Sequence, residues 1–104
     1  SEDEDKSIAL LDFAYNGKDL HSEAIGDGPI NAVKNALYKC IPDLDFTVLG
    51  YDEHALSEGS TAKAAAYIQM RDNKTGKVTF GVGVSSSITR ASIRGMFSAL
   101  NRLA

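Results

Sequence analysis

Two stretches of this sequence place a pair of glycines shortly before a segment with helical periodicity. The first is Gly26-Asp27-Gly28-Pro29, and the second is Gly81-Val82-Gly83-Val84, which Ser85-Ser86-Ser87 follows. The start of a helix presents amide groups without intrahelical partners and a partial positive charge, so it suits a small anion such as a carboxylate. The alternative interpretation is that glycine only permits a tight turn and close packing. Neither stretch carries a nucleotide-binding fingerprint, so phosphate is a weak candidate.

Alanine recurs at alternate positions in the segment that leads to Tyr67. In a strand, Ala62, Ala64 and Ala66 would share one face, although alanine is a poor strand former. One explanation is a helix that lies close over them. The other is a small apolar pocket, sized for a branched aliphatic group, that the missing side-chain volume leaves. From these residues alone we favour close helix packing, since dense packing is the usual state of protein interiors.

Polar and acidic side chains come together in Tyr51-Asp52-Glu53-His54. The carboxylates beside His54 do not form a recognised metal-ligand spacing, and His21 is the one other histidine, so we expect no metal site. Gly83–Ser87 is not a nucleophile elbow, and Cys40 has no basic or capping context that would activate its thiol. The sequence therefore predicts no catalytic residues.

Length and composition are typical of one globular domain. The chain has 104 residues, of which 43% are hydrophobic and 24% charged, and its net charge of −3 argues against a nucleic-acid partner. A single cysteine excludes an internal disulfide and fits the reducing cytoplasm. No apolar run approaches about 18 residues, so we expect no membrane span. We interpret residues 1–7 as an acidic linker or the cut end of a longer protein, and residues 8–104 as a single domain.

Hydrophobic periodicity and turn signals predict two hairpins, two helices and one further strand. Asn16-Gly17 is a strong hairpin signal, Pro29 suits the first position of a helix, and Pro42 ends that helix. The expected strands are 8–15, 18–25, 44–51, 62–71 and 77–84, the expected helices are 29–40 and 88–103, and 52–61 is expected to be a loop.

The predicted order is ββα-β-ββα, an α+β fold of duplicated ββα units around an antiparallel sheet, with the helices packed on one face. We expect the domain to be dimeric. Aligning the Gly-x-Gly pairs shifts the second unit by 55 positions, whereas aligning Ile30 with Ile88 shifts it by 58, so the register of the repeat stays open. One face of the last strand is expected to carry Val78, Phe80, Val82 and Val84.

Four segments and the C-terminal tail follow one another between about Leu11 and Arg102. They are Gly26-Asp27-Gly28-Pro29, Tyr51-Asp52-Glu53-His54-Ala55-Leu56, Ala64-Ala65-Ala66-Tyr67, Gly81-Val82-Gly83-Val84 and Ala91 to Arg102. Together they resemble the C-terminal regulatory domain of 2-isopropylmalate synthase, and citramalate synthases carry similar domains. The resemblance implies that a separate metal-dependent barrel condenses an acyl-CoA with a 2-oxo acid. The regulatory domain itself would then need no cofactor and have no activity alone.

The same resemblance implies an effector pocket and pairing of subunits. The expected effector is leucine, or isoleucine if the parent enzyme is a citramalate synthase, and the expected partners are a second copy and the catalytic barrel. A purely structural dimerisation module is the alternative. The implied pocket residues are Gly26, Asp27, Gly28, Ile30, Val48, Tyr51, Ala55, Ala62, Ala64 and Val84.

Each chemical group of the effector has an expected place in this pocket. The carboxylate would meet helix-start amides, the ammonium backbone carbonyls, and the isobutyl group the alanines and Val48. The family usually has asparagine where Asp27 stands, so this aspartate would either repel the carboxylate or accept from the ammonium. Overlapping specificity among branched-chain amino acids is expected, because one methylene is worth about 1–3 kcal/mol.

Overall fold

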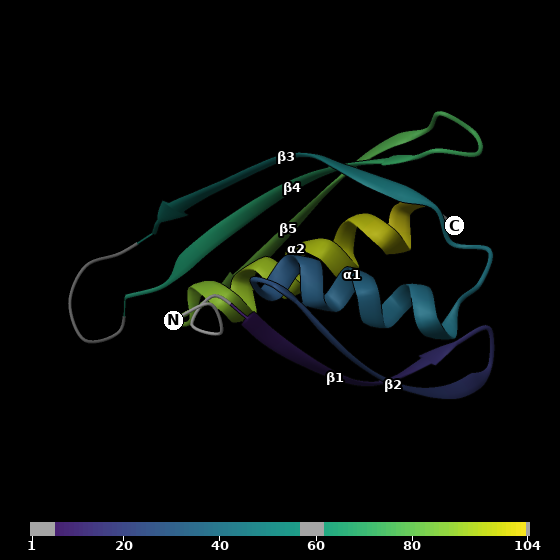
Figure 1. Ribbon diagram of the computed structural model, residues 1–104. Helices are drawn as coiled ribbons and strands as arrows, with labels where there is room; N and C mark the ends of the chain where they lie inside the picture. Colours follow the sequence, from purple (N-terminus) through teal and green to yellow (C-terminus); the bar gives the residue numbers. More distant parts are fainter. Residues whose placement is uncertain (1–5, 57–61, 104) are drawn as a thin grey trace. The chain divides into compact units, whose positions relative to one another are not determined.

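The computed structural model describes residues 6–56 and 62–103. The chain divides into two compact units, residues 1–44 and 45–104 (Figure 1). Each unit consists of an antiparallel sheet with one helix packed against it. The predicted α+β class with a repeated strand–strand–helix order is confirmed, and the strands belong to two sheets, one of two strands and one of three.

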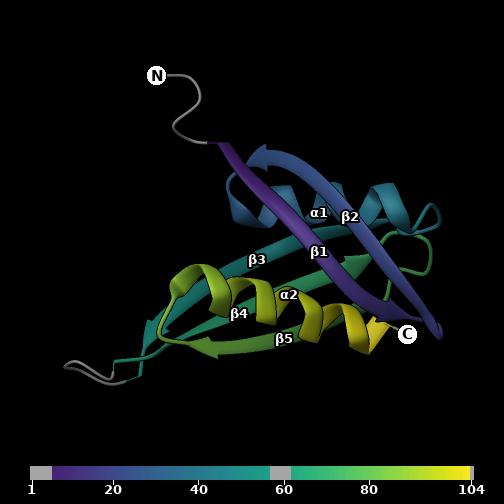
Figure 2. The ribbon, with the colours of Figure 1, turned by 90° about the horizontal axis from the view of Figure 1, so that it is seen from below.

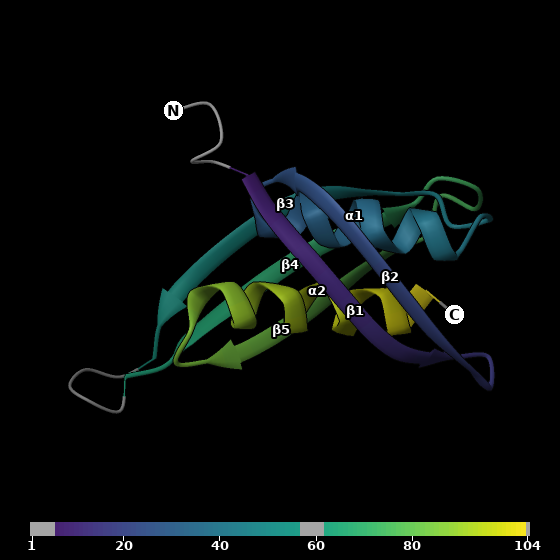
Figure 3. The ribbon, with the colours of Figure 1, turned by 60° about the horizontal axis from the view of Figure 1, so that its bottom comes forward.

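The N-terminal unit is a hairpin with a helix on one face. β1 (Lys6–Tyr15) and β2 (Lys18–Asp27) pair antiparallel, and α1 (Pro29–Cys40) packs against them (Figure 3). Asn16 and Gly17 have φ angles of 51° and 77°, the positive values that a type I′ turn requires. The buried residues of the helix are Ala32, Val33, Ala36 and Leu37.

Both strands of this hairpin are two residues longer than the sequence predicts. β1 begins at Lys6 instead of Ile8, and β2 ends at Asp27 instead of Ile25. The extra residues pair with each other, because Lys6 lies opposite Asp27 in the register. The first Gly-x-Gly stretch therefore begins inside a strand, which ends directly at the helix start.

The C-terminal unit is a three-stranded sheet with a longer helix. Its strands β3 (Phe46–Ala55), β4 (Ala64–Asp72) and β5 (Val78–Ser85) lie in the order β3-β4-β5 and pair antiparallel. α2 (Ile88–Leu103) packs on β5 and β4, as Figure 2 shows. Three of its buried residues, Ala91, Gly95 and Ala99, have little or no side chain, so the helix can lie close to the sheet.

Two expectations for this unit are wrong. Residues 52–55 belong to β3 and pair with Tyr67 to Ala64 of β4, whereas the sequence predicts a loop there. Ala62 precedes β4, which begins at Ala64. The sequence misjudges β3 because its second half is exposed on both faces and so lacks the alternation of apolar and polar residues that indicates a strand. Residues 57–61 of the predicted loop lie outside the described residues.

The structure fixes the register of the repeat. Gly28 stands immediately before the start of α1, and Ser87 immediately before that of α2, so corresponding residues differ by 59 positions (87 minus 28). Neither of the two alignments considered from the sequence gives this shift. At a shift of 59 the buried helix residues correspond, with Ala32, Ala36 and Leu37 matching Ala91, Gly95 and Met96.

The second Gly-x-Gly stretch packs against α2. Gly81 and Gly83 lie within β5, and a Cβ atom added to either one would overlap the helix backbone at Gly95. Gly95 itself lies against β4, where an added Cβ would be 3.3 Å from the carbonyl oxygen of Ala66. Ala66 is fully buried at this contact. Close helix packing, the explanation favoured from the sequence, therefore accounts for Ala66.

Candidate functional site

The predicted site residues fall into two groups, one in each unit. Gly26, Asp27, Gly28 and Ile30 belong to the N-terminal unit, at the junction of β2 and α1. The other six residues belong to the C-terminal unit, on or beside β3, β4 and β5.

The first helix start has the geometry of an anion-binding element. Gly28 is the N-cap with a φ of +92°, a conformation that favours glycine, and its carbonyl accepts from the amide of Ala32 at 3.1 Å. No side chain caps this helix end, so the amides of Ile30 and Asn31 have no acceptor within the helix. Gly26 has another role, because a Cβ there would lie 2.7 Å from the Cα of Ala32.

Asp27 is engaged by a neighbouring strand. Its Oδ1 accepts from Nζ of Lys6 at 2.9 Å, across the paired ends of β1 and β2. Both side chains are largely exposed, and exposed ion pairs are worth about 0–1 kcal/mol. Lys6 nevertheless offsets the negative charge of Asp27 close to the amides of the helix start.

The second helix start differs from the first because its own side chains cap it. Oγ of Ser87 accepts from the amide of Arg90 at 3.3 Å, and Oγ of Ser85 accepts from the amide of Ser87 at 3.1 Å. These bonds occupy donors that an anion would otherwise use. The two Gly-x-Gly stretches are therefore not equivalent as candidate anion sites, and the uncapped start at Gly28 is the better one.

A β-bulge brings the C-terminal site residues to one face. Val48 pairs with Met70 and Gly50 with Gln69, so Leu49 is an extra residue in β3. In β3, the even-numbered residues before the bulge and the odd-numbered residues after it lie on the same face of the sheet. This is the face on which α2 packs against β4 and β5. This shift of alternation places four predicted site residues on that face: Val48, Tyr51, Ala55 and Ala64.

Two other predicted residues are separated from these four. Val84 pairs with Ala65, so it lies on the opposite face of the sheet, and it is 38% exposed. Ala62 is half-buried and precedes the first residue of β4. Within this unit, the face that carries Tyr51 is thus formed without Val84.

Tyr51 is at the centre of a hydroxyl cluster between β3 and α2. Its Oη lies 2.5 Å from Oγ of Ser92 and donates to Oε2 of Glu53 at 2.9 Å, while Ser92 Oγ donates to the carbonyl of Ile88 at 2.9 Å. Partial burial raises the pKa of the Tyr51 hydroxyl above its ordinary value of about 10, and the Ser92 bond opposes this rise. The hydroxyl therefore stays protonated at neutral pH and is able to donate.

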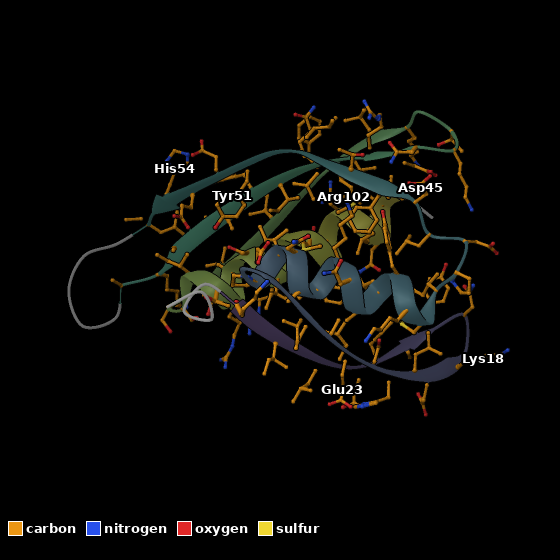
Figure 4. All side chains as sticks on the ribbon, in the orientation of Figure 1. Lys18, Glu23, Asp45, Tyr51, His54 and Arg102 are labelled. Atoms are coloured by element: carbon orange, nitrogen blue, oxygen red, sulfur yellow. The ribbon has the colours of Figure 1, made fainter. Side chains whose placement is uncertain are left out.

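The side chains of the acidic segment around Tyr51 alternate between the two faces of the sheet. Tyr51 and Glu53 lie on the α2 side, whereas Asp52 and His54 lie on the outer side, as the labelled Tyr51 and His54 in Figure 4 indicate. His54 Nε2 is 3.1 Å from Asp52 Oδ2, and its ring meets that of Tyr67 edge-on at 5.5 Å between centroids. Glu53 and Ser92 are the members of the hydroxyl cluster that were not among the residues predicted from the sequence. The signal available for Glu53 was its spacing of two from Tyr51, which places both side chains on one face of a strand.

A second polar cluster lies on the β1–β2 hairpin. Nδ1 of His21 is 2.8 Å from Oδ1 of Asp12, and its Nε2 is 3.4 Å from Oε2 of Glu23. The bond to Asp12 is the main reason that the His21 pKa is raised above its ordinary value, and Glu23 raises it further. A shallow hollow of about 420 Å³ beside this cluster contains none of the predicted site residues. It is lined by Asp12, Phe13, Ala14, Asp19, Leu20 and His21.

The part of the chain that the structure describes contains neither a metal-binding cluster nor a membrane-spanning helix. No three His, Cys, Asp or Glu side chains in residues 6–56 and 62–103 are grouped so as to hold a metal ion. Neither described helix is long and apolar enough to cross a membrane.

The strand–strand–helix order occurs twice along the chain, which defines a duplicated α+β domain. The chain belongs to the family described as the LeuA allosteric (dimerisation) domain, whose model matches residues 1–104. Membership in this family supports a role in regulation and dimerisation, as the resemblance implied.

The chain is similar to several curated 2-isopropylmalate synthases. It is 40% identical over 102 residues to the enzyme of Corynebacterium glutamicum, with 98% of this chain and 16% of the relative covered. It is 45% identical over 91 residues to that of Clostridium acetobutylicum, covering 86% of this chain and 16% of the relative. The relative from Mycobacterium ulcerans is 42% identical over 102 residues, with 96% of this chain and 17% of the relative covered. The chain thus spans about a sixth of the length of these relatives.

Proposed function

We propose that this chain is the regulatory domain of a 2-isopropylmalate synthase, that it binds leucine, and that leucine binding inhibits leucine biosynthesis by feedback. The names of the relatives support the parent enzyme, and the family description supports an allosteric role. The condensation of an acyl-CoA with a 2-oxo acid would take place in a separate metal-dependent barrel. A coupling of about 1–3 kcal/mol between effector and catalytic sites is typical of such regulation.

One observation carries the choice of a branched aliphatic effector. The bulge at Leu49 places Val48, Tyr51, Ala55 and Ala64 on one face of the C-terminal unit. Alanine and valine are small apolar neighbours for a branched side chain, and the Tyr51 hydroxyl, which is hydrogen-bonded to Ser92 and Glu53, lies on the same face. An isobutyl group fits this combination of small apolar walls and one polar neighbour.

The N-terminal unit offers a separate element for the carboxylate of an amino acid. The amides of Ile30 and Asn31 are directed along an uncapped helix start, where a negative charge is favoured by about 0.3–1 kcal/mol or more. Lys6 reduces the repulsion that Asp27 would otherwise exert on such a group. We propose that this helix start, rather than the capped one at Ser87, is the element of the N-terminal unit that suits a carboxylate.

The experiment is a thermal-shift and calorimetric titration of the 104-residue chain with leucine, isoleucine and valine. A ligand at about 100 times its dissociation constant adds about 2.7 kcal/mol to the stability of the domain. We expect leucine to stabilise the chain most. Ala55→Leu would fill the proposed face and weaken leucine binding, whereas Ala14→Leu, the same change at an exposed site on β1, would leave it unchanged. If no amino acid stabilises a chain that is dimeric in solution, the purely structural module is the correct interpretation.

For dimerisation we propose the outer face of β4 and β5. The apolar residues of this face are exposed, Phe80 at 60% and Val82 at 47%. Exposed apolar patches on soluble proteins mark interaction sites. Edge pairing through β5 is opposed, because Ser98 Oγ accepts from the amide of Val82 and Arg94 donates to the carbonyl of Val84. We commit to a second copy of this chain as the occupant, since the family description names dimerisation and an apolar face can pair with itself about a two-fold axis.

The oligomeric state tests this face. Phe80→Asp is expected to convert the dimer to a monomer in sedimentation analysis, because it would place a charge in the centre of an apolar contact. Ile8→Asp is the matched control, since Ile8 is 72% exposed on the outer face of the other sheet. A dimer that persists in Phe80→Asp and dissociates in Ile8→Asp would assign the interface to the hairpin instead.

A further inference from the structure

The hydroxyl cluster around Tyr51 has more acceptors than donors. Three contacts join Glu53 to Tyr51, Tyr51 to Ser92, and Ser92 to the Ile88 carbonyl. A carboxylate and a carbonyl only accept, so the hydroxyl hydrogens of Tyr51 and Ser92 are the two donors for these three contacts. The protein itself therefore supplies hydrogens for at most two of these three contacts.

The charge of Glu53 is also unbalanced. Among residues 6–56 and 62–103, the ion pairs of the structure are those of Asp27, Asp12, Glu23 and Asp52, and Glu53 takes part in none. Its neighbours on the same face are Tyr51 and Ala55 on its own strand and Ala66 across the ladder, which are uncharged. A cation that donates hydrogen bonds would correct both the missing hydrogen and the unpaired charge.

We propose that Glu53, together with the Tyr51 hydroxyl, binds the ammonium group of the amino-acid effector. This inference rests on the proposed function and names the part of the effector that the C-terminal unit recognises. An ammonium group has three donors and no acceptor, so it can donate to the Glu53 carboxylate and to the hydroxyl oxygen of Tyr51, which lie beside each other on this face. Tyr51 would then donate to Ser92 and Ser92 to the Ile88 carbonyl, while the ammonium group would supply the hydrogen that Glu53 accepts.

The position of Glu53 relative to the apolar residues fits the size of a branched-chain amino acid. Glu53 pairs with Ala66, and the next pair on the same face is Ala55 with Ala64. Pairs that are two residues apart on a strand are separated by about 7 Å. An amino acid whose ammonium contacts Glu53 can therefore place its side chain against Ala55 and Ala64.

The alternative is that Glu53 only positions Tyr51. In that case its loss would weaken every ligand of this face equally, whether or not the ligand carries an ammonium group. Two ligands separate the explanations: leucine, and 4-methylpentanoate, which has the same isobutyl and carboxylate groups but no ammonium. Leucinol, which keeps the ammonium and lacks the carboxylate, provides a third comparison.

The experiment measures binding of these ligands to the 104-residue chain and to Glu53→Gln, by calorimetry for leucine and by NMR titration for the weaker ligands. Glutamine keeps the size of the side chain and removes its charge. We expect affinity for leucine and leucinol to fall about tenfold or more, and affinity for 4-methylpentanoate to change less than twofold. Asp52→Asn is the control, because it removes a carboxylate from the adjacent residue on the opposite face.

Each outcome decides the question. Equal loss for leucine and 4-methylpentanoate, or unchanged leucine affinity in Glu53→Gln, would overturn the role of Glu53 while leaving leucine binding established. Failure of the unmodified chain to bind any of the three ligands would overturn the proposed effector itself. Unfolding curves of the variants establish that each one folds, which the exposed position of Glu53 leads us to expect.

Discussion

Gly83→Ala tests whether the second Gly-x-Gly stretch serves helix packing. Gly83 lies in β5 with its Cα directed at α2, and an added Cβ would overlap the carbonyl oxygen of Ala91 and the amide nitrogen of Gly95. Both obstacles are backbone atoms of a helix, so they cannot rotate away as a flexible side chain would. The helix would have to move away from the strand to accept one methyl group.

The expected cost follows from two opposing terms. Overpacking of this kind costs about 1–3 kcal/mol, and the rigidity of the obstacle places Gly83→Ala at the upper end. Replacing glycine where φ is not positive returns about 0.4–1 kcal/mol, because the unfolded chain loses freedom. The net destabilisation is therefore about 2 kcal/mol, equivalent to a fall in Tm of about 8–16 °C for a domain of this size.

Thermal and urea unfolding followed by far-UV circular dichroism measure this change, with Gly50→Ala as the matched control. Gly50 also lies in a strand, but its added Cβ would meet the Gln69 side chain at 3.5 Å, an ordinary contact distance. We expect Gly50→Ala to be neutral or slightly stabilising. If Gly83→Ala unfolded at the same temperature as Gly50→Ala, the packing explanation for this glycine would be refuted.

Two further predictions concern other contacts within each unit. Gly95→Ala should change the free energy of unfolding by less than about 1 kcal/mol, because the gain in helix propensity offsets contacts of 3.0 Å with the movable Ile68 side chain and 3.3 Å with the Ala66 carbonyl oxygen. A loss as large as that of Gly83→Ala would contradict this. His21 should titrate above its ordinary pKa in an NMR titration, and Asp12→Asn should lower that pKa. Because the folded-state pKa is raised, the stabilisation from protonated His21 is present below about pH 6.5 and is lost as the pH rises through the folded-state pKa. A His21 pKa at or below the ordinary value would exclude the bond to Asp12 in solution.

The local sequence determined most of the secondary structure. Asn16-Gly17 produces the hairpin turn because both residues adopt positive φ, and Pro29 begins α1 because its ring fixes a helical φ and its missing amide hydrogen is not needed there. The helix α2 has the predicted bounds, 88 to 103, because its apolar stripe has helical spacing over its full length. These signals depend on neighbours in the chain, so the sequence contains them in full.

The candidate site depended on contacts that the sequence does not display. Alternation alone places Val48 and Tyr51 on opposite faces of a strand, and only the bulge at Leu49 brings them to the same one. The outward direction of Val84 likewise follows from Gly81 and Gly83 facing α2, since adjacent residues of a strand point to opposite faces.

The difference between the two helix starts was also decided by tertiary structure. The sequence presented two Gly-x-Gly stretches with the same apparent purpose. In the folded chain Gly28 is an N-cap with positive φ, whereas Gly81 and Gly83 lie inside a strand and Ser87 caps the helix that follows. The sequence by itself therefore determined which elements form, because propensities and turns act over a few residues. Strand register decided which face of the sheet each residue occupies. The close approach of α2 to β5 decided that Gly81 and Gly83 pack against a helix.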